Sequence, residues 1–472
     1  MKSKKILYLI FAGCLWLSAA ACSGGGNNPG KTDYILPDYD LKKEELSIDI
    51  AGWVMPADFN ETQFHYLAES GINVLQLASA GSNTYNLGLS GELNEKNKEF
   101  LKTCEDNGYK VYPHIDGKIA KNILQAEKLN DYKAAYGVIF DEPNKIQIDE
   151  IADYVSQFNQ KADGKELFVN LYPSFATTIK TDFGGDYYSY LEYYCNKVLE
   201  NVTSGQKWLS ADRYPLTYDG KSQPCLDTGW LADVEAVAVT ARKYENVKTN
   251  FFIQTMPYGG ENNSGNVIDS RDRVPTYEDV RLQEYVLISF GYDMISCFCY
   301  ATPAVGIEFL DRQTAMIDRD GNKTEVYSAV AKANNEILAF DHVMEQFSWQ
   351  GVFTCDAGKT ATGKDRTSNA SFSGLVNRMY VSAIDNLESV TASCDTLFGY
   401  FIDKEENAGF TIVNYNDSSL GLSDKVSVKF NSSYHYTKAQ CYIGGEKQTI
   451  DLKDNVLELT LGVGEGVFVI PY

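Results

Sequence analysis

The sequence has few of the residues that bind metals and phosphate groups. The 472-residue chain contains only four histidines, and its cysteines form no Cys-x-x-Cys pair, so a zinc site is not expected. No Gly-x-Gly-x-x-Gly motif follows the first apolar run, and there is no Walker lysine motif, which argues against dinucleotides and nucleoside triphosphates as ligands. We therefore predict neither a metal nor a cofactor.

Positive charge is also scarce. The chain has 42 Lys and Arg against 64 Asp and Glu, a formal net charge of -22. Such a chain repels phosphate backbones and anionic lipid surfaces, so we expect no nucleic-acid partner. Beyond the N-terminal region no segment is long and apolar enough to cross a bilayer. The eight cysteines beyond Cys22 form no dense framework, and Cys297 and Cys299 are expected to be packed thiols.

The first 22 residues are typical of a secretion signal, with lysines, then an apolar run, then small residues. The ending "AAAC" resembles the lipobox of bacterial lipoproteins, which implies that Cys22 is lipidated and becomes the mature N-terminus. We predict a lipid-anchored protein of the cell envelope, in the outer membrane of a Gram-negative bacterium, with residues 1–22 as signal and 23–45 as flexible tether. An ordinary signal peptide with a chance cysteine is the alternative.

Residues 46–348 alternate apolar β-like runs with amphipathic helical stretches. In one such stretch Asn60 and Gln63 form an N-terminal capping pair, and Gly71 ends the helix. The strands are nearly continuous in apolar residues, as expected for strands buried on both faces. Eight strand–helix units over about 300 residues predict a (β/α)8 TIM barrel. A doubly wound open sheet is the alternative, but it lacks the Gly-rich phosphate loop.

The pattern of apolar and polar residues changes after residue 348. Residues 349–472 contain short strands with period-two alternation, separated by Asn, Asp, Ser and Gly. We predict a C-terminal antiparallel β-sandwich domain.

The active site of a TIM barrel lies at the C-terminal ends of its strands. Here those ends are rich in carboxylates and aromatic residues and poor in lysine, with no Ser-His-Asp or Cys-His arrangement. The candidate catalytic residues are Glu142, Asp212 and Glu261. The candidate substrate-binding residues are Trp53, His114, Asp116, Asp141, Asn170, Tyr172, Tyr214, Gln254, Tyr258 and Tyr300.

Carboxylates in an aromatic cleft are suited to glycoside hydrolysis. One carboxylic acid protonates the leaving oxygen, and a second carboxylate attacks the anomeric carbon or activates water. The stretch "GVIFDEPN" delivers Asp141 and Glu142 to the mouth of the predicted barrel. Two structural alternatives remain open at this point. "DEP" is also a turn and helix-cap signal with Pro143 at the first helical position, and Asp212 is a possible ion-pair partner of Arg213.

The stretch "GVIFDEPN" also resembles the Asn/Asp-Glu-Pro element of clan A glycoside hydrolases, including the family 42 β-galactosidases. The resemblance implies that Glu142 is the general acid/base. "LSADRYPL", "SCFCYATP" and "DRDGNKTEVYSAVAKANNEI" are similar to segments of secreted barrel proteins of this kind. The terminal "LGVGEGVFVIPY" is similar to the closing strand of the β-domain that follows many glycosidase barrels.

The chain departs from that family at the seventh predicted strand. The family's nucleophile is a glutamate there, and this sequence has Gln254. Our leading hypothesis is a glycoside hydrolase with Glu142 as the acid and Asp212 or Glu261 as the second carboxylate. A non-catalytic glycan-binding lipoprotein is the alternative that Gln254 motivates. A structural surface protein built on a barrel is a third possibility, which a fold alone never excludes.

Overall fold

The computed structural model describes most of the chain beyond the N-terminal region. The described residues are 36–78, 83–218, 224–257, 273–304, 314–363 and 370–472, with the backbone alone at 260–261 and 267–268. The predicted Cys22 lipidation site and Tyr258 lie outside the described residues, as does the side chain of Glu261.

Eight parallel strands form a barrel, as the sequence predicts. They are β1 (Asp49–Trp53), β2 (Val74–Leu77), β3 (Lys110–Pro113), β4 (Gly137–Asp141), β5 (Glu166–Leu171), β6 (Lys207–Asp212), β9 (Val247–Gln254) and β12 (Met294–Phe298). Their order is β3-β2-β1-β12-β9-β6-β5-β4, and every ladder is parallel. Two isolated parallel bridges join β3 to β4 and close the ring, Val111 with Ala135 and His114 with Ile139.

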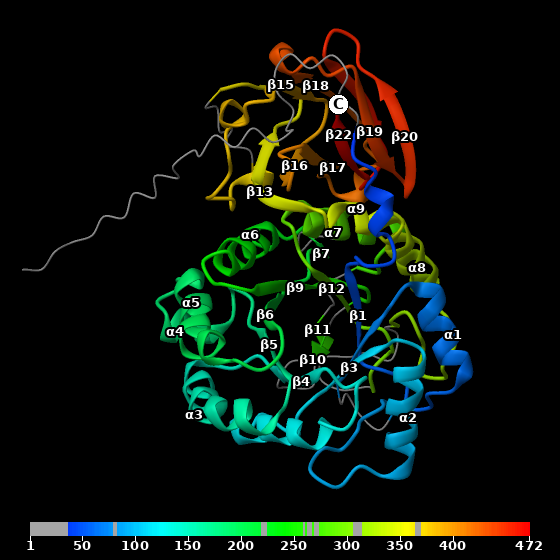
Figure 1. The fold of residues 1–472 in the computed structure, drawn as a ribbon, viewed down its shortest axis with the longest axis vertical. Helices are drawn as coiled ribbons and strands as arrows, with labels where there is room; N and C mark the ends of the chain where they lie inside the picture. The colour runs from blue at the N-terminus through cyan, green and yellow to red at the C-terminus, as the bar shows by residue number, and fades with distance from the viewer. Residues whose placement is uncertain are drawn as a thin grey trace, which may run out of the picture.

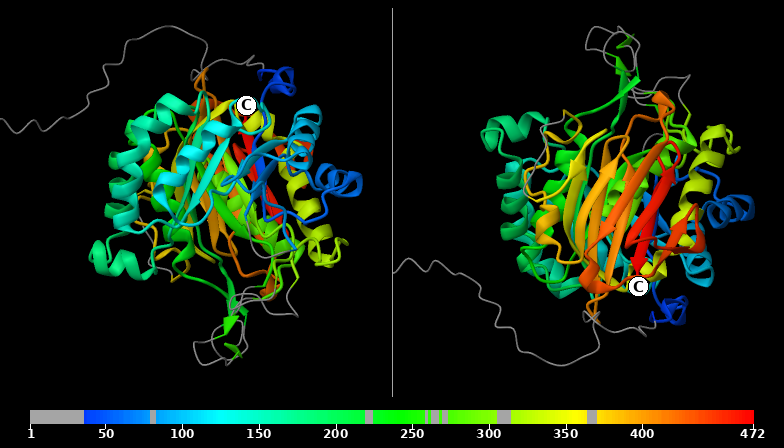
Figure 2. Two further views of the ribbon diagram at one scale, coloured as in Figure 1. Left: turned by 90° about the horizontal axis from the view of Figure 1, so that it is seen from below. Right: turned by 90° about the horizontal axis from the view of Figure 1, so that it is seen from above.

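Helices surround the barrel (Figure 1). They are α1 (Glu61–Ser70), α2 (Glu95–Asp106), the 3-10 helix η2 (Ala120–Leu129), α3 (Lys145–Lys161), α4 (Thr177–Asp182), α5 (Tyr187–Lys197), η3 (Leu199–Asn201), α6 (Trp230–Ala241), α7 (Tyr277–Ser289), α8 (Glu325–Leu338) and α9 (Asp341–Met344). The sequence pattern did not predict α4, and it joined α8 and α9 into one helix. Two hairpins interrupt the alternation, β7 (Leu216–Tyr218) with β8 (Pro224–Leu226) and β10 (Gly260–Glu261) with β11 (Val267–Ile268). Figure 2 shows the hairpin of β10 and β11 projecting from one end of the barrel.

Asparagine side chains begin several of these helices. Asn60 caps α1 by accepting from the Gln63 backbone N–H, as predicted, and the left-handed Gly71 ends that helix. Asn144 caps α3 in a full capping box with Gln147. Pro143 therefore precedes the cap and is not the first helical residue. Because Asn144 serves as the cap, helix capping does not account for Asp141 and Glu142.

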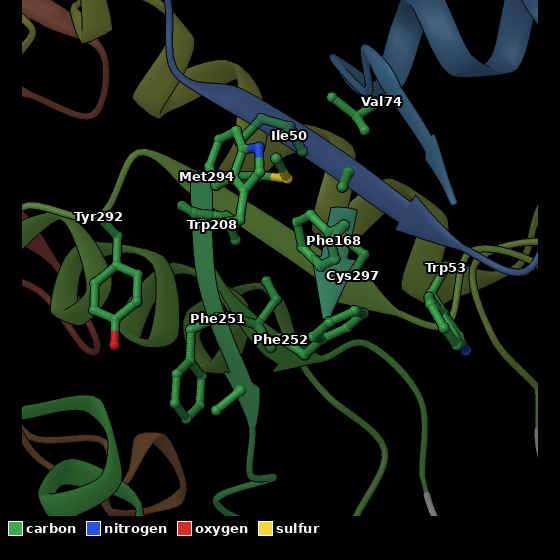
Figure 3. Close-up of a cluster of buried hydrophobic side chains, with 14 of the residues drawn as sticks. Ile50, Trp53, Val74, Phe168, Trp208, Phe251, Phe252, Tyr292, Met294 and Cys297 are labelled. Atoms are coloured by element: carbon green, nitrogen blue, oxygen red, sulfur yellow. The ribbon is translucent and has the colours of Figure 1, made fainter. Parts of the chain in front are cut away.

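The interior of the barrel is a packed core of large side chains. Figure 3 shows Phe168, Trp208 and Met294 among the buried residues that the strands contribute, whereas Phe251 packs against Tyr292. Trp53 belongs to the same cluster, at the C-terminal end of β1. Filling the barrel with apolar groups leaves only the mouth open to ligands.

The C-terminal domain is an antiparallel β-sandwich of two sheets. One has the order β13-β16-β17-β22-β19-β20 and the other β14-β15-β18-β21. The strands are β13 (Phe347–Cys355), β14 (Thr360–Ala361), β15 (Leu387–Ala392), β16 (Thr396–Asp403), β17 (Ala408–Asn414), β18 (Asp424–Phe430), β19 (Lys438–Ile443), β20 (Glu446–Asp451), β21 (Val456–Leu461) and β22 (Gly466–Pro471). Short 3-10 turns lie at η4 (Ala370–Phe372), η5 (Val381–Ala383), η6 (Ser418–Leu420) and η7 (Ser432–Tyr434). Because β13 begins at Phe347, the sandwich begins two residues before the predicted boundary.

Helix α7 lies between the two domains and contacts β16, β17 and β22 (Figure 1). The N-terminal turn η1 (Tyr39–Lys42) also packs on the C-terminal side of the molecule. The Tyr39 hydroxyl donates to Asp403, and Asp40 pairs with His342 and Lys447. The prediction of a flexible tether through residue 45 is therefore wrong for residues 36–45, because a buried aromatic ring and ion pairs fix this segment.

Cys297 and Cys299 are buried, unpaired thiols, as predicted. Among the residues that the structure describes, no helix combines the length and the apolar character needed to traverse a bilayer.

Candidate active site

A cavity of about 920 Å³ opens at the C-terminal ends of the barrel strands. Its lining comes from the ends of most of the barrel strands and from the segments that follow β3, β4 and β5. The described lining residues are Trp53, Ala78, His114, Lys118, Asp141, Glu142, Asn144, Asn170, Tyr172, Pro173, Phe175, Ala176, Thr177, Thr178, Asp212, Arg213, Tyr214, Phe252 and Phe298.

Eight of the predicted site residues line this cavity together. They are Trp53, His114, Asp141, Glu142, Asn170, Tyr172, Asp212 and Tyr214. The structure therefore brings three carboxyl groups, from the ends of β4 and β6, into one aromatic-lined space.

Three of the predicted residues are not among the described residues that line the cavity. Asp116 lies in the segment after β3, where its carboxylate accepts from the Gln125 amide at 3.2 Å. Tyr300 is fully buried, packed beside Gly52 of β1. Gln254 is also fully buried, and its side-chain oxygen accepts from the Leu216 backbone N–H at 2.9 Å.

The environment of Gln254 explains its position at the end of β9. Its amide nitrogen is directed at the carbonyl oxygens of Leu216 and Arg273, at 3.5 and 3.3 Å. The side chain thus satisfies backbone groups of two loop segments, which is a structural task. A buried glutamine with this task is not evidence of a degraded nucleophile.

Glu142 has a backbone conformation that non-glycine residues rarely adopt. Its φ is 49°, and its backbone N–H donates to the Asn170 carbonyl at 2.8 Å. Strained residues of this kind cluster at functional sites, where surrounding bonds hold them. The side chain forms an ion pair with Lys118, whose ammonium nitrogen lies 3.6 Å from a carboxylate oxygen of Glu142.

Asn170 connects two of the carboxyl groups. Its amide nitrogen donates to Asp212 at 3.0 Å and to Asp141 at 3.3 Å. The Asn170 nitrogen lies 3.3 Å from the Asp141 oxygen and 3.0 Å from the Asp212 oxygen. The separation of these two oxygens therefore cannot exceed the sum of the two distances. That bound agrees with the separations of about 5 to 9.5 Å between the paired carboxyl groups of glycosidases.

A buried chain of hydrogen bonds fixes the orientation of the Asn170 amide. Ser210 donates to the Asn170 side-chain oxygen at 2.9 Å, and Asn250 donates to Ser210 at 2.9 Å. Ser296 donates to Asn250 at 2.8 Å, and Gln76 donates to Ser296 at 3.2 Å. Because Ser210 donates to the oxygen, the NH2 group of Asn170 faces the two aspartates.

Asp212 is the carboxyl group whose pKa is raised most clearly in this site. Burial raises its pKa well above the ordinary value, and the charges of Glu142 and Asp141 raise it further. Hydrogen bonds from Asn170 and Tyr214 lower the pKa but do not reverse the shift. The site therefore combines a carboxyl group whose protonated form is favoured, Asp212, with a second carboxyl group, Glu142, that is paired with Lys118.

Arg213 belongs to the wall of the cavity and does not pair with Asp212. Its guanidinium binds Asp227, donates to Ser174 at 2.8 Å and donates to Asp233 at 3.2 Å. The structural alternative for Asp212, an ion pair with Arg213, is therefore wrong.

His114 and the aromatic residues form the rest of the lining. Burial lowers the pKa of His114, so the ring is neutral at pH 7. Its Nδ1 lies 3.4 Å from the Ile115 carbonyl, while its buried Nε2 has no partner among the described residues. Trp53 packs edge-on against His114 and Phe252, with ring centroids 5.4 Å apart in each pair. Tyr214 stacks on Phe298 with a centroid separation of 4.7 Å.

Sequence reasoning missed several lining residues. Phe252 and Phe298 lie near the strand ends and could have been included by position. Lys118 and Phe175 belong to segments after β3 and β5, and no sequence pattern marks their orientation. Within the described residues, no group of three or more His, Cys, Asp or Glu side chains is arranged to hold a metal ion.

No protein-family model and no curated protein sequence matches the chain. Solved structures do share its fold. One named as a glycoside hydrolase has a TM-score of 0.51 and 12% identity, over 90% of this chain and 92% of that chain. The family 39 glycoside hydrolase of the gut symbiont Bacteroides cellulosilyticus WH2 has a TM-score of 0.46 and 11% identity, over 91% and 82% of the two chains. A family 5 glycoside hydrolase of Bacteroides vulgatus ATCC 8482 has a TM-score of 0.44 and 10% identity, over 90% and 89%.

The first of these similarities establishes the architecture. The chain is a (β/α)8 barrel followed by a β-sandwich domain, the arrangement of that solved glycoside hydrolase. At 12% identity the likeness extends to the fold, and the activity has to be inferred from the site.

Proposed function

We propose that the protein is a glycoside hydrolase that acts on a poly- or oligosaccharide by two-carboxylate acid/base catalysis. The observation that carries the proposal is the meeting of Asp141, Glu142 and Asp212 in one cavity, with Asp212 and Asp141 both bound to Asn170. A protonated carboxyl group beside carboxylates is the pairing that glycoside hydrolysis requires.

In this proposal Asp212 is the proton donor. The bond between the anomeric carbon and the leaving oxygen breaks, and the leaving oxygen takes the Asp212 proton. Water then supplies a hydroxyl group to the anomeric carbon and a proton to a carboxylate. Burial and the neighbouring negative charges raise the pKa of Asp212, which favours the protonated form that a proton donor needs.

The second carboxylate comes from the β4 end. Glu142 is paired with Lys118, and its bond to the Asn170 carbonyl holds its strained backbone. The proposal thus exchanges the roles predicted from sequence, which made Glu142 the acid and Asp212 or Glu261 its partner. Asp141 stays the other candidate for the anion, since its distance from Asp212 is suitable.

The remaining lining supports a carbohydrate ligand. Trp53, Tyr172 and Tyr214 present aromatic rings with polar edges, which suit a sugar ring that has apolar faces and hydroxyl groups at its edge. The unpartnered Nε2 of His114 is free to accept from a sugar hydroxyl. We propose Asn170 as a further ligand of the sugar ring, once substrate displaces part of its present bonding.

The test is reducing-sugar release from a panel of plant, microbial and host glycans by wild type, Glu142→Gln and Asp212→Asn. Turnover by wild type that falls about 10²-fold or more in both variants supports the proposal. Binding of a glycan by all three proteins without turnover would instead establish the glycan-binding alternative. Turnover that survives both substitutions would place catalysis outside this cavity.

We also propose that Cys22 carries a lipid anchor to the cell envelope. Replacement of Cys22 by Ala is expected to move the protein from the membrane fraction to the soluble fraction, because the acyl chains would be lost. Fractionation of cells that express the two forms measures this. Retention of Cys22→Ala in the membrane fraction would contradict the anchor.

A further inference from the structure

Phe175 is a large apolar side chain exposed at the wall of the catalytic cavity. It is 69% exposed, although it belongs to the residues that line the cavity. It lies in the segment between β5 and α4, next to the lining residues Ala176 and Thr177. Single exposed apolar residues are common, but this one borders a ligand cavity.

One face of the Phe175 ring is supported by a rigid cation. The Arg213 guanidinium carbon lies 5.2 Å from the ring centroid. Arg213 is itself held by Asp227, Asp233 and Ser174, and its side chain is only 12% exposed. The cation–π contact with Arg213 therefore holds the ring in place, while most of the ring surface is exposed to solvent.

The contact with Arg213 also relates the Phe175 ring to the other residues of the cavity. Arg213 follows Asp212 directly in the chain, and both residues line the cavity. In the proposed mechanism Asp212 protonates the leaving oxygen, so the leaving part of the substrate lies on the Asp212 side of the scissile bond. Phe175 thus lines the same cavity as the proposed proton donor, where its ring is available to the departing part of the substrate.

We propose that Phe175 is the platform of a leaving-group subsite, on which the first sugar ring released by cleavage stacks. This inference rests on the proposed glycosidase function. The apolar C–H face of a pyranose ring matches an open aromatic face, and Thr177, which also lines the cavity, carries a hydroxyl group beside it. The preferred substrate is accordingly an oligosaccharide or polysaccharide whose leaving group is itself a sugar.

The experiment compares two substrates with the same sugar at the cleaved bond. One is the oligosaccharide that wild type cleaves best in the glycan panel, and the other is the corresponding glycosyl fluoride, whose leaving group has no ring. Phe175→Ala is expected to lower kcat/KM for the oligosaccharide roughly tenfold and to leave kcat/KM for the fluoride near the wild-type value. Phe175→Trp keeps the aromatic platform and is expected to retain most of the oligosaccharide activity.

Leu420→Ala is the matched control, because Leu420 is 58% exposed on the C-terminal domain. It should change neither rate. Equal loss on both substrates, or no loss on either, in Phe175→Ala would overturn the inference while leaving the glycosidase function intact. Failure of wild type to cleave either substrate would instead refute the proposed function, and the platform with it.

Discussion

Asp212 has neighbours that act on its pKa in opposite directions. Burial and the charges of Glu142 and Asp141 raise the pKa, whereas hydrogen bonds from Asn170 and Tyr214 lower it. A general acid must be protonated, so kcat/KM should fall as the pH rises through the pKa of Asp212. The raised pKa predicts that activity persists into the pH range in which an ordinary aspartate has already lost its proton.

The Tyr214 hydroxyl provides a test of this balance. Tyr214→Phe removes a hydrogen bond that lowers the pKa of Asp212, while a ring that can stack on Phe298 remains. The pKa should rise, and the alkaline limb of the kcat/KM profile should move up by roughly half to one pH unit. The measurement is kcat/KM against pH for the two proteins.

Tyr194→Phe is the control, because the Tyr194 hydroxyl is buried without a partner among the described residues. Its profile should match that of wild type. A shift of the alkaline limb to lower pH in Tyr214→Phe would contradict Asp212 as the group that titrates there.

Single residues also show what the sequence could and could not predict about the site. Asp141, Glu142 and Asp212 were found because they end apolar strands, and a barrel brings strand ends together. Gln254 ends a strand too, but its hydrogen-bond partners Leu216 and Arg273 come from distant segments of the chain. No local sequence pattern predicts these partners. The raised pKa of Asp212 depends on burial and on Glu142, which are properties of the assembled barrel.

At the scale of elements, the barrel strands orient the site through their interior polar residues. β2, β12, β9 and β6 each contribute one member of the chain Gln76, Ser296, Asn250 and Ser210 that ends on Asn170 of β5. Every serine hydroxyl in it donates one bond and accepts one. Such a directional network specifies a single orientation for the Asn170 amide.

Ser210→Ala should therefore affect catalysis as well as stability. The substitution leaves the Asn170 oxygen and the Asn250 amide without their partner, which lowers the free energy of unfolding by roughly 1–3 kcal/mol. The freed Asn170 amide no longer holds Asp141 and Asp212 in place, so kcat should fall roughly tenfold. Denaturant unfolding and steady-state kinetics measure the two effects.

Ser289→Ala separates the two effects. Ser289 is equally buried and donates to the Tyr285 carbonyl at 2.7 Å, but it lies away from the site at the domain interface. It should lose stability without a change in kcat. If both variants keep the wild-type kcat, the network has no positioning role.

The loops explain why some residues that line the cavity could not be predicted from the sequence. Lys118 and Phe175 lie in segments whose composition resembles that of ordinary loops. Lys118 contributes to the site through its ion pair with Glu142, and Phe175 through its contact with Arg213, and both partners follow other strands. Helix boundaries, in contrast, follow local rules, so the Asn60 cap and the Gly71 stop of α1 could be predicted from sequence.

At the scale of the whole molecule, α7 unites the barrel with the β-sandwich. Its residue Glu284 is fully buried, and neither carboxylate oxygen has a partner among the described residues. Burial raises the pKa of Glu284 well above its ordinary value, and the charge of Glu336 adds to the shift. The folded protein therefore holds a proton there at pH values at which the unfolded chain has already released it.

The direction of the pH effect follows from this difference. Since the folded state holds the extra proton, the free energy of unfolding falls as the pH rises from about 4.5, the ordinary pKa of a glutamate, towards the raised pKa. Glu284→Met removes the buried carboxyl group and should raise stability at pH 7 by about 1–3 kcal/mol. In denaturant titrations the gain should grow as the pH rises above about 4.5, the ordinary pKa of a glutamate.

Glu278→Met is the control in the same helix, where the side chain is partly exposed. It should change stability by no more than about 0.5 kcal/mol. A Glu284→Met protein that is less stable than wild type at every pH would show that Glu284 has a partner that stabilises it.

The two-domain architecture was predictable, because eight apolar strands alternating with helices and then a series of short strands leave few ways to bury their faces. The contacts between the parts were not. Tyr39 and Asp40 looked like tether residues, yet they bind Asp403, His342 and Lys447, hundreds of positions away. Such contacts form only in the folded protein, and no local sequence pattern predicts them.

The most direct test of the proposed chemistry compares Asp212→Asn and Glu142→Gln on an oligosaccharide and on the corresponding glycosyl fluoride. Fluoride departs with little help from an acid, so loss of the proton donor matters less for it. Asp212→Asn should lose about 10²- to 10⁴-fold on the oligosaccharide and far less on the fluoride, whereas Glu142→Gln should lose activity on both. The reverse pattern, with the fluoride still cleaved by Glu142→Gln and not by Asp212→Asn, would contradict Asp212 as the proton donor and return that role to Glu142.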